Sequence, residues 1–132
     1  MYWSPTWPYS SSLTGITSAQ LASGYEKAAN KEWNQQLGAS LALFDVAAAA
    51  LKASGNPKDK QAVATAMKTL SVSTPLGHLA WGSGPNPNVV ATPIIGGQWV
   101  ATPSGPYPID FVICENSSDP NVPVAAKLTP YR

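Results

Sequence analysis

The sequence has little charge and almost no arginine, histidine or cysteine. Only 11% of the 132 residues are charged, against about 25% in an average protein. The only arginine is the last residue, so the basic surface that binds a nucleic acid backbone cannot form. We therefore expect no nucleic-acid partner, and the low charge indicates surfaces that are buried between lobes or between chains.

The single cysteine and the single histidine exclude several kinds of site. Cys114 cannot form a disulfide within the chain or build a thiolate cluster. His78 lies in a strand-like stretch, and no Gly-x-Ser-x-Gly nucleophile elbow accompanies it. We predict that the chain is not an enzyme, that it uses no metal or cofactor, and that His78 lies on the solvent side of a strand.

Long apolar segments are also missing. The longest candidate, Leu41 to Leu51, is shorter than the ~20 residues that span a bilayer, and it carries Asp45. We expect a soluble chain. Residues 1–20 lack the basic, then apolar, then small pattern of a secretion signal, so a mature exported protein or an excised piece would have lost it.

Helix-favouring residues fill the first half of the chain, whereas ten of the thirteen prolines follow residue 72. Capping patterns and apolar spacing predict three helices, at 18–33, 39–54 and 57–70. Thr17 and Gln20 form a capping-box pattern, while Asn56 and Pro57 resemble an N-cap followed by a first helical residue. The second helix is apolar nearly all round, which predicts an interior position.

Proline-bounded apolar runs in the second half predict three strands, at 74–82, 89–101 and 108–114. Phe111 to Cys114 is apolar throughout, which predicts cover on both faces. Gly96-Gly97 indicates a turn or a bulge, and the tail from Asn116 to Arg132 an extended strap on a surface. The expected fold is α/β, with three helices packed on one side of a small sheet.

Two features are open to a functional interpretation. The aromatic residues of the first segment, Tyr2, Trp3, Trp7 and Tyr9, either contact a small organic ligand or pack onto the helices. Asp45 lies among apolar neighbours and needs either a partner within the protein, such as a salt bridge or a helix-end contact, or a ligand.

The order of several short motifs carries a family resemblance. The motifs are Tyr2-Trp3-Ser4-Pro5, Leu13-Thr14-Gly15, Tyr25-Glu26, Leu37-Gly38, Ala62 to Leu70, Thr74-Pro75-Leu76-Gly77 and Gly96-Gly97-Gln98-Trp99. This succession resembles the last third of type I solute-binding proteins of the branched-chain amino acid class. It covers nearly the whole chain, but only the carboxy-terminal portion of that family.

The resemblance implies the carboxy-terminal part of a two-lobed periplasmic-binding-protein fold. Residues 1–82 would hold a hinge strand and the three-helix part of the first lobe, and residues 83–132 would hold strands and a strap that cross to the second lobe. The implied function is extracytoplasmic solute binding for an ABC importer, without chemistry, in the periplasm or outside the cytoplasm. The implied ligand is a small organic acid such as an amino acid or an aromatic acid.

The resemblance also suggests site residues and partners. The segment around Tyr2 to Pro5 would leave the hinge, and the start of the Ala-rich helix would approach the cleft. The predicted ligand contacts are Tyr2, Trp3, Ser4, Ser40 and Phe44. We expect Trp3, Ser40, Phe44 and Asp45 to lie near one another.

The expected partners are the solute, the remainder of the receptor or a second copy of the chain, and the permease of the transporter. The main alternative is a self-standing binding module that uses exposed Trp and Tyr side chains as a stacking platform. Such a module would be mostly β, so the three expected helices argue against it. An enzyme ranks third.

Overall fold

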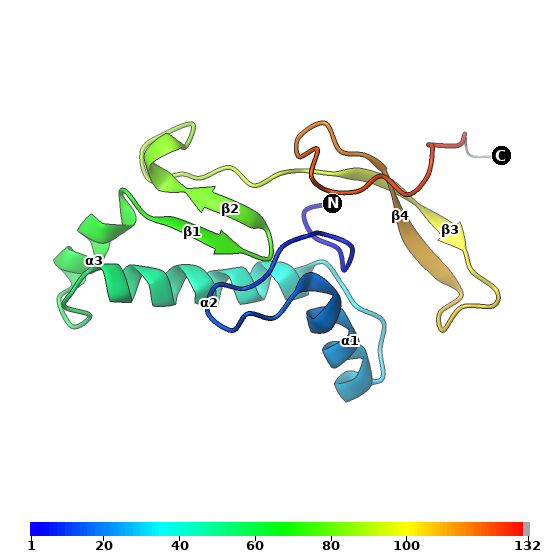
Figure 1. The fold of residues 1–132 in the computed structure, drawn as a ribbon, viewed down its shortest axis with the longest axis horizontal. Helices are drawn as coiled ribbons and strands as arrows, with labels where there is room; N and C mark the ends of the chain where they lie inside the picture. Colours follow the sequence, from blue (N-terminus) through cyan, green and yellow to red (C-terminus); the bar gives the residue numbers. More distant parts are fainter. Residues whose placement is uncertain (131–132) are drawn as a thin grey trace.

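The computed structural model describes residues 1–130, which form three helices and two separate antiparallel sheets of two strands (Figure 1). In chain order the elements are α1 (Ser18–Ala29), α2 (Gln36–Ala53), α3 (Lys60–Met67), β1 (Ser71–Thr74), β2 (Gly77–Ala80), a 3-10 turn (Trp81–Ser83), β3 (Gly96–Ala101) and β4 (Ile109–Glu115). The β1–β2 hairpin lies along α2, whereas the β3–β4 hairpin stands at the other end of the molecule. The mixed α/β class is confirmed, but the single sheet is not.

Helix α1 begins as the sequence predicts and ends earlier. The Thr17 side chain accepts a hydrogen bond from the N–H of Gln20, and the Gln20 side chain accepts from the N–H of Thr17. This reciprocal capping box satisfies two N–H groups that the first turn leaves free. The helix stops at Asn30, which adopts a left-handed conformation with φ of 51°. The predicted end at residue 33 is therefore wrong.

Helix α2 is longer than predicted and is not an interior helix. Its 18 residues turn Gly38, Ala42, Asp45 and Ala50 inward. Ser40, Leu43, Phe44, Ala47 and Leu51 are exposed and form one stripe, which we call the outer face of α2. The β1–β2 hairpin covers only one side of the helix, so an all-round apolar composition does not place it inside.

By length and composition alone, α2 is long and apolar enough to cross a membrane. The sequence predicted a shorter helix, at 39–54, and so did not indicate an apolar helix of this length. In the folded chain the helix packs against β1, α3 and α1.

Helix α3 starts at Lys60 rather than at residue 57. The carboxyl group of Asp59 accepts from the N–H groups of Gln61 and Ala62, at 2.9 and 3.2 Å, and so caps the helix. The predicted N-cap at Asn56 is therefore wrong. Its C=O instead accepts from the N–H of Asp59 in the turn that precedes the helix.

The predicted strand 74–82 contains a tight turn and then β2, which pairs with β1 in a hairpin. Thr74 ends β1, and its hydroxyl donates to the C=O of Gly77 and accepts from the N–H of Leu76. Gly77 has φ of 96°, a conformation that side chains rarely adopt. The Thr-Pro-Leu-Gly motif therefore reverses the chain instead of extending it.

The β3–β4 hairpin confirms the bulge and corrects the predicted burial. The register shifts between Gly96 and Gly97, as a β-bulge does, while residues 89–95 form no strand. Within the predicted stretch 111–114 only Ile113 is buried and the other three residues are half-buried, so the cover on the two faces is partial. The described part of the tail does lie on this strand as a strap, because the N–H groups of Ala125 and Ala126 donate to the C=O of Ile113, while the last two residues of that prediction lie outside the described residues.

Two clusters of buried side chains hold these elements together. The first brings together Trp3, Trp7, Ala22, Ala42, Leu76, Ile95, Ile113 and Val122. The second consists of Ala50, Leu70, Val72 and Leu79. The first cluster draws on both sides of the expected boundary at residue 82, and Met1 and Ile95 also exchange backbone hydrogen bonds. The division into lobes stays a prediction.

Candidate functional site

The structure separates the five predicted ligand contacts into a covered group and an exposed pair. Trp3 has 0% of its surface exposed and donates its indole N–H to the hydroxyl of Ser18 at 3.2 Å. Its ring covers Gly38, where a Cβ would lie 2.2 Å from ring atoms. Ser4 is buried and shares a hydrogen bond with Thr6. Tyr2 is half-buried against the same core.

The exposed pair is Ser40 and Phe44 on the outer face of α2. The two residues are four positions apart, which places them one above the other on a helix. Phe44 is 65% exposed and Leu43 beside it 72% exposed. A hydroxyl and an aromatic ring are therefore presented together to whatever covers this face.

The predicted group of Trp3, Ser40, Phe44 and Asp45 does not form one surface. Trp3 packs over Gly38. Ser40 follows two residues later, which turns it about 200° around the helix axis. Trp3 and Ser40 therefore lie on opposite sides of the first turns of α2.

The packing interpretation of the aromatic segment holds for its two tryptophans, since Trp3 and Trp7 both belong to the first buried cluster. Tyr9 donates its hydroxyl to Asp119 in the tail. Burial, and then this hydrogen bond, raise the pKa of Tyr9. The segment thus ties the helices to the carboxy-terminal part of the chain.

Asp45 finds its partners in the serine-rich loop that follows the aromatic segment. Its Oδ1 atom accepts from the hydroxyl of Ser11 at 2.7 Å, the hydroxyl of Ser12 at 3.3 Å and the N–H of Leu13 at 2.7 Å. The side chain is 1% exposed, and its Oδ2 atom has no hydrogen-bond partner among residues 1–130. The predicted need for partners is confirmed, but neither a salt bridge nor a helix end supplies them.

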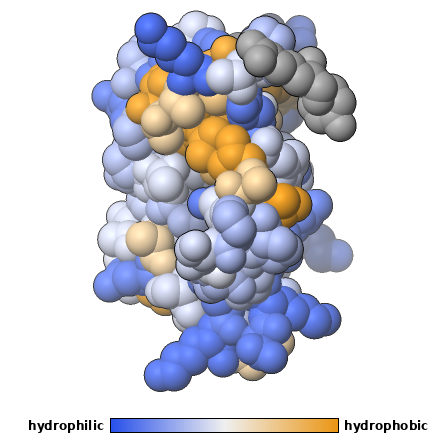
Figure 2. Space-filling view, turned by 90° about the vertical axis from the view of Figure 1, so that its right-hand side faces the viewer, coloured by the Kyte–Doolittle hydropathy of each residue, from blue (hydrophilic) through white to orange (hydrophobic). Residues whose placement is uncertain are grey.

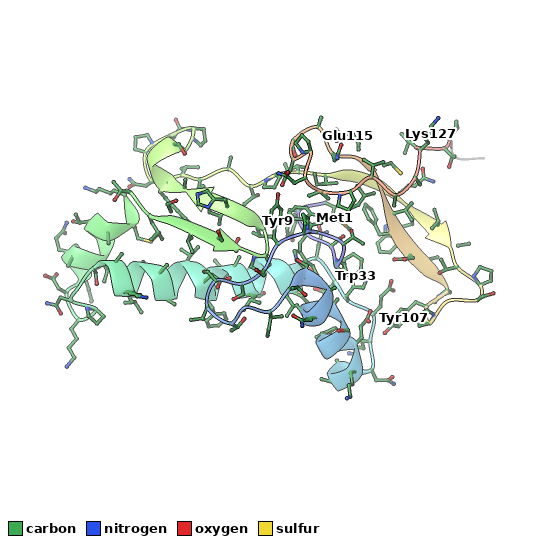
Figure 3. All side chains as sticks on the ribbon, in the orientation of Figure 1. Met1, Tyr9, Trp33, Tyr107, Glu115 and Lys127 are labelled. Carbon is green, nitrogen blue, oxygen red and sulfur yellow. The ribbon has the colours of Figure 1, made fainter. Side chains whose placement is uncertain are left out.

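Carboxyl groups and aromatic rings also line a cavity next to the C-terminal end of α1. A cavity of about 200 Å³ lies there, lined by Glu26, Glu32 and Asp110 together with Trp33 and Tyr107. Figure 3 shows Trp33 on the connection between α1 and α2 and Tyr107 on the loop between β3 and β4. Burial, and then the charges of Asp110 and Glu26, raise the pKa of Glu32. No three ligating side chains among residues 1–130 are placed to hold a metal ion.

His78 is exposed on β2, as predicted, but it has a hydroxyl partner that the sequence did not reveal. Its Nε2 atom lies 2.9 Å from the hydroxyl of Ser71 on β1. A serine nucleophile also needs a third group that orients the histidine ring. Among residues 1–130 only Ser71 forms a hydrogen bond with this ring, so the pair is a contact across the hairpin.

Comparisons of the chain with models of protein families, with characterised proteins and with solved structures give no match. The function is therefore inferred from the exposed and buried groups described above.

Proposed function

We propose that this chain is the carboxy-terminal part of a two-lobed solute-binding receptor that serves an ABC importer and performs no chemistry. Its ligand would be a small organic acid such as an amino acid or an aromatic acid. The receptor would act in the periplasm or outside the cytoplasm. The observation that carries the proposal is the outer face of α2, where Ser40 and Phe44 stand exposed among apolar neighbours.

An exposed apolar stripe on a helix usually means that another part of an assembly covers it. On α2 the stripe includes Leu43, Phe44 and Leu51, at 72, 65 and 43% exposure. The other end of the molecule is similar, because Figure 2 shows a diagonal band of apolar side chains at the end that carries β3 and β4. The exposed apolar residues of this end include Trp99, Ile109, Val124 and Leu128. A receptor lobe, or a second copy of the chain, would cover both surfaces.

Ser40 and Phe44 suit the recognition of an organic acid. A hydroxyl can donate to a carboxylate, and an aromatic ring packs on an apolar or aromatic side chain. Among the five predicted contacts these two are the most accessible, so they would make direct contact. Trp3 and Ser4 would instead fix the start of α2 from its buried side.

The alternative, a self-standing module with an aromatic stacking platform, draws support from one residue. Trp99 on β3 is 55% exposed and meets Phe111 edge to face, with ring centroids 5.3 Å apart. The aromatic segment at the start of the chain cannot be that platform, because Trp3 and Trp7 are buried. We therefore rank this module second.

Light scattering coupled to size-exclusion chromatography tests the assembly. We expect a mass above the 13.8 kDa of one chain, and a lower mass when Leu43 and Phe44 are both changed to Ser. The matched control changes two exposed alanines that lie off this face, Ala19 and Ala28, to Ser. A stable monomer that binds no hydrophobic dye would contradict the proposal.

Equilibrium dialysis of the assembled protein with leucine, phenylalanine and benzoate tests ligand binding. The variant Phe44→Ala should weaken binding about tenfold, which corresponds to about 1.4 kcal/mol. Lys58→Ala, at an exposed residue outside α2, should leave it unchanged. The bound acid should be recovered unaltered. Equal affinities in the two variants, or a chemically changed acid, would refute the assignment.

A further inference from the structure

A cavity of about 480 Å³ lies on the side of α2 that faces β1 and the serine-rich loop. This volume falls within the range of about 300–1,000 Å³ that small-molecule sites occupy. Its polar lining consists of Ser12, Asp45, Lys52, Ser71 and Ser73, and Ala48 and Ala49 belong to its apolar lining. Both signs of charge are thus present in one cavity.

Asp45 is the buried polar group of this lining. Three donors from the loop satisfy its Oδ1 atom, while Oδ2 has no hydrogen-bond partner among residues 1–130. Leaving a buried acceptor without a donor is unfavourable, and more so when the group is charged. A ligand that supplies a donor to Oδ2 would recover this cost.

Lys52 provides the opposite charge on the same side of the helix. It follows Asp45 by seven residues, which is about 10.5 Å along the helix axis and nearly two full turns. Lys52 is exposed, so its flexible stem can bring the ammonium group back over the cavity. An anionic group bound here would also lie near the hydroxyls of Ser71 and Ser73.

We propose that this cavity binds a small zwitterion of amino-acid size, with its ammonium group on Oδ2 of Asp45 and its carboxylate at Lys52. The apolar lining of Ala48 and Ala49 accommodates a short aliphatic chain between the two charges. The site is separate from the outer face of α2 that Ser40 and Phe44 occupy, since Asp45 lies about 140° from Ser40 around the helix. It does not depend on the receptor function proposed above.

Amide-resolved NMR of the full chain, titrated with β-alanine, γ-aminobutyrate and 5-aminovalerate, tests the proposal. Butylamine and butyrate each carry only one of the two charges and serve as comparison compounds. We expect saturable shifts at the amides of Leu13, Val72 and Ser73, with a Kd on the order of 1 mM. The two single-charge compounds should bind at least about tenfold more weakly.

Two variants remove one charge each. Lys52→Gln keeps most of the stem without the ammonium group, and Asp45→Asn removes the acceptor at Oδ2 while an amide oxygen can still face the loop. Each should raise the Kd about tenfold. Lys58→Gln, at an exposed lysine outside the cavity lining, is the matched control and should leave the Kd unchanged.

Circular dichroism shows whether each variant folds, and if Asp45→Asn does not, Lys52→Gln alone decides. The proposal is overturned if no zwitterion gives saturable shifts at the three amides, if Lys52→Gln binds as well as the parent chain, or if butylamine binds as well as the zwitterions. Shifts confined to Ser40 and Phe44 would overturn it too, while they would support the receptor proposal.

Discussion

The contact between Trp3 and Gly38 gives the sharpest stability prediction. An added Cβ at Gly38 would lie 2.2 to 2.5 Å from three atoms of the Trp3 ring. The ring has little room to move, because Trp3 has no exposed surface, donates to Ser18 and meets the edge of Trp33 at a centroid distance of 5.8 Å. The variant Gly38→Ala must therefore displace either the ring or the start of α2.

The size of the effect follows from two opposing contributions. Overpacking a tight core costs about 1–3 kcal/mol, and the very short contacts place Gly38 at the upper end of this range. Alanine in place of glycine within a helix returns about 1 kcal/mol. We expect Gly38→Ala to lower the free energy of unfolding by about 2 kcal/mol, or the Tm by about 7 °C in a chain of this length.

Gly24→Ala in α1 is the matched control, since a Cβ there meets nothing within 4 Å. It should gain about 1 kcal/mol from helix propensity alone. Urea unfolding followed by circular dichroism measures both variants. The double variant Trp3→Leu with Gly38→Ala should lose less than the sum of its two single changes, because the smaller side chain makes room for the methyl group. If Gly38→Ala is as stable as Gly24→Ala, the tight contact is not real.

Four further predictions concern carboxyl groups and a cap. Burial raises the pKa of Glu32. Protonated Glu32 therefore favours the folded state in acid, and this contribution to stability is lost as the pH rises through the raised pKa. Glu32→Gln should raise the Tm at neutral pH and not in acid. The hydrogen bonds from Ser117 lower the pKa of Glu115. The contribution of its carboxylate to the stability of the fold is therefore lost as the pH falls, and Glu115→Gln should lower the Tm at neutral pH only. Thr17→Ala should cost about 1 kcal/mol in urea unfolding, whereas Thr17→Ser should cost less, because serine retains the capping hydroxyl. Asp45→Ala should cost about 1–3 kcal/mol in the same assay, since it leaves the buried hydroxyl of Ser11 without its acceptor.

Local signals in the sequence predicted local structure well. The capping box at Thr17 and Gln20 needs only residues three positions apart, and the structure contains both of its hydrogen bonds. Interactions of this range are fixed by a few neighbouring residues, so the sequence specifies them without knowledge of the fold.

The errors arose where two local patterns competed. Asn56-Pro57 and Asp59 are both suitable helix starts, and the carboxyl group of Asp59 caps because it reaches two N–H groups at once. The apolar run from residue 74 to 82 indicated a strand, but the hydroxyl of Thr74 and the positive φ of Gly77 close a turn inside it. A turn that depends on a side-chain hydrogen bond is poorly marked by hydrophobic pattern.

The contacts around α2 join residues that are far apart in the sequence, so the sequence did not predict them. Asp45 accepts from Ser11 to Leu13, which lie 32 to 34 positions earlier in the chain. The sequence marked Asp45 as a carboxyl group that needs partners, but nothing in its spacing identified the serine-rich loop. An apolar composition on every side likewise could not show which side the β1–β2 hairpin would cover.

The two faces of α2 have different requirements, and this difference separates the two proposals. The outer face lacks apolar cover at Phe44, which a protein surface or an organic ligand can provide. The inner face is already covered by the hairpin and the loop, but within residues 1–130 no donor reaches Oδ2 of Asp45. A protein surface packed on the outer face cannot supply that donor, because Asp45 is turned away from it. Phe44→Ala and Lys52→Gln should therefore act independently, each on one binding event, and their effects on the two affinities should not couple.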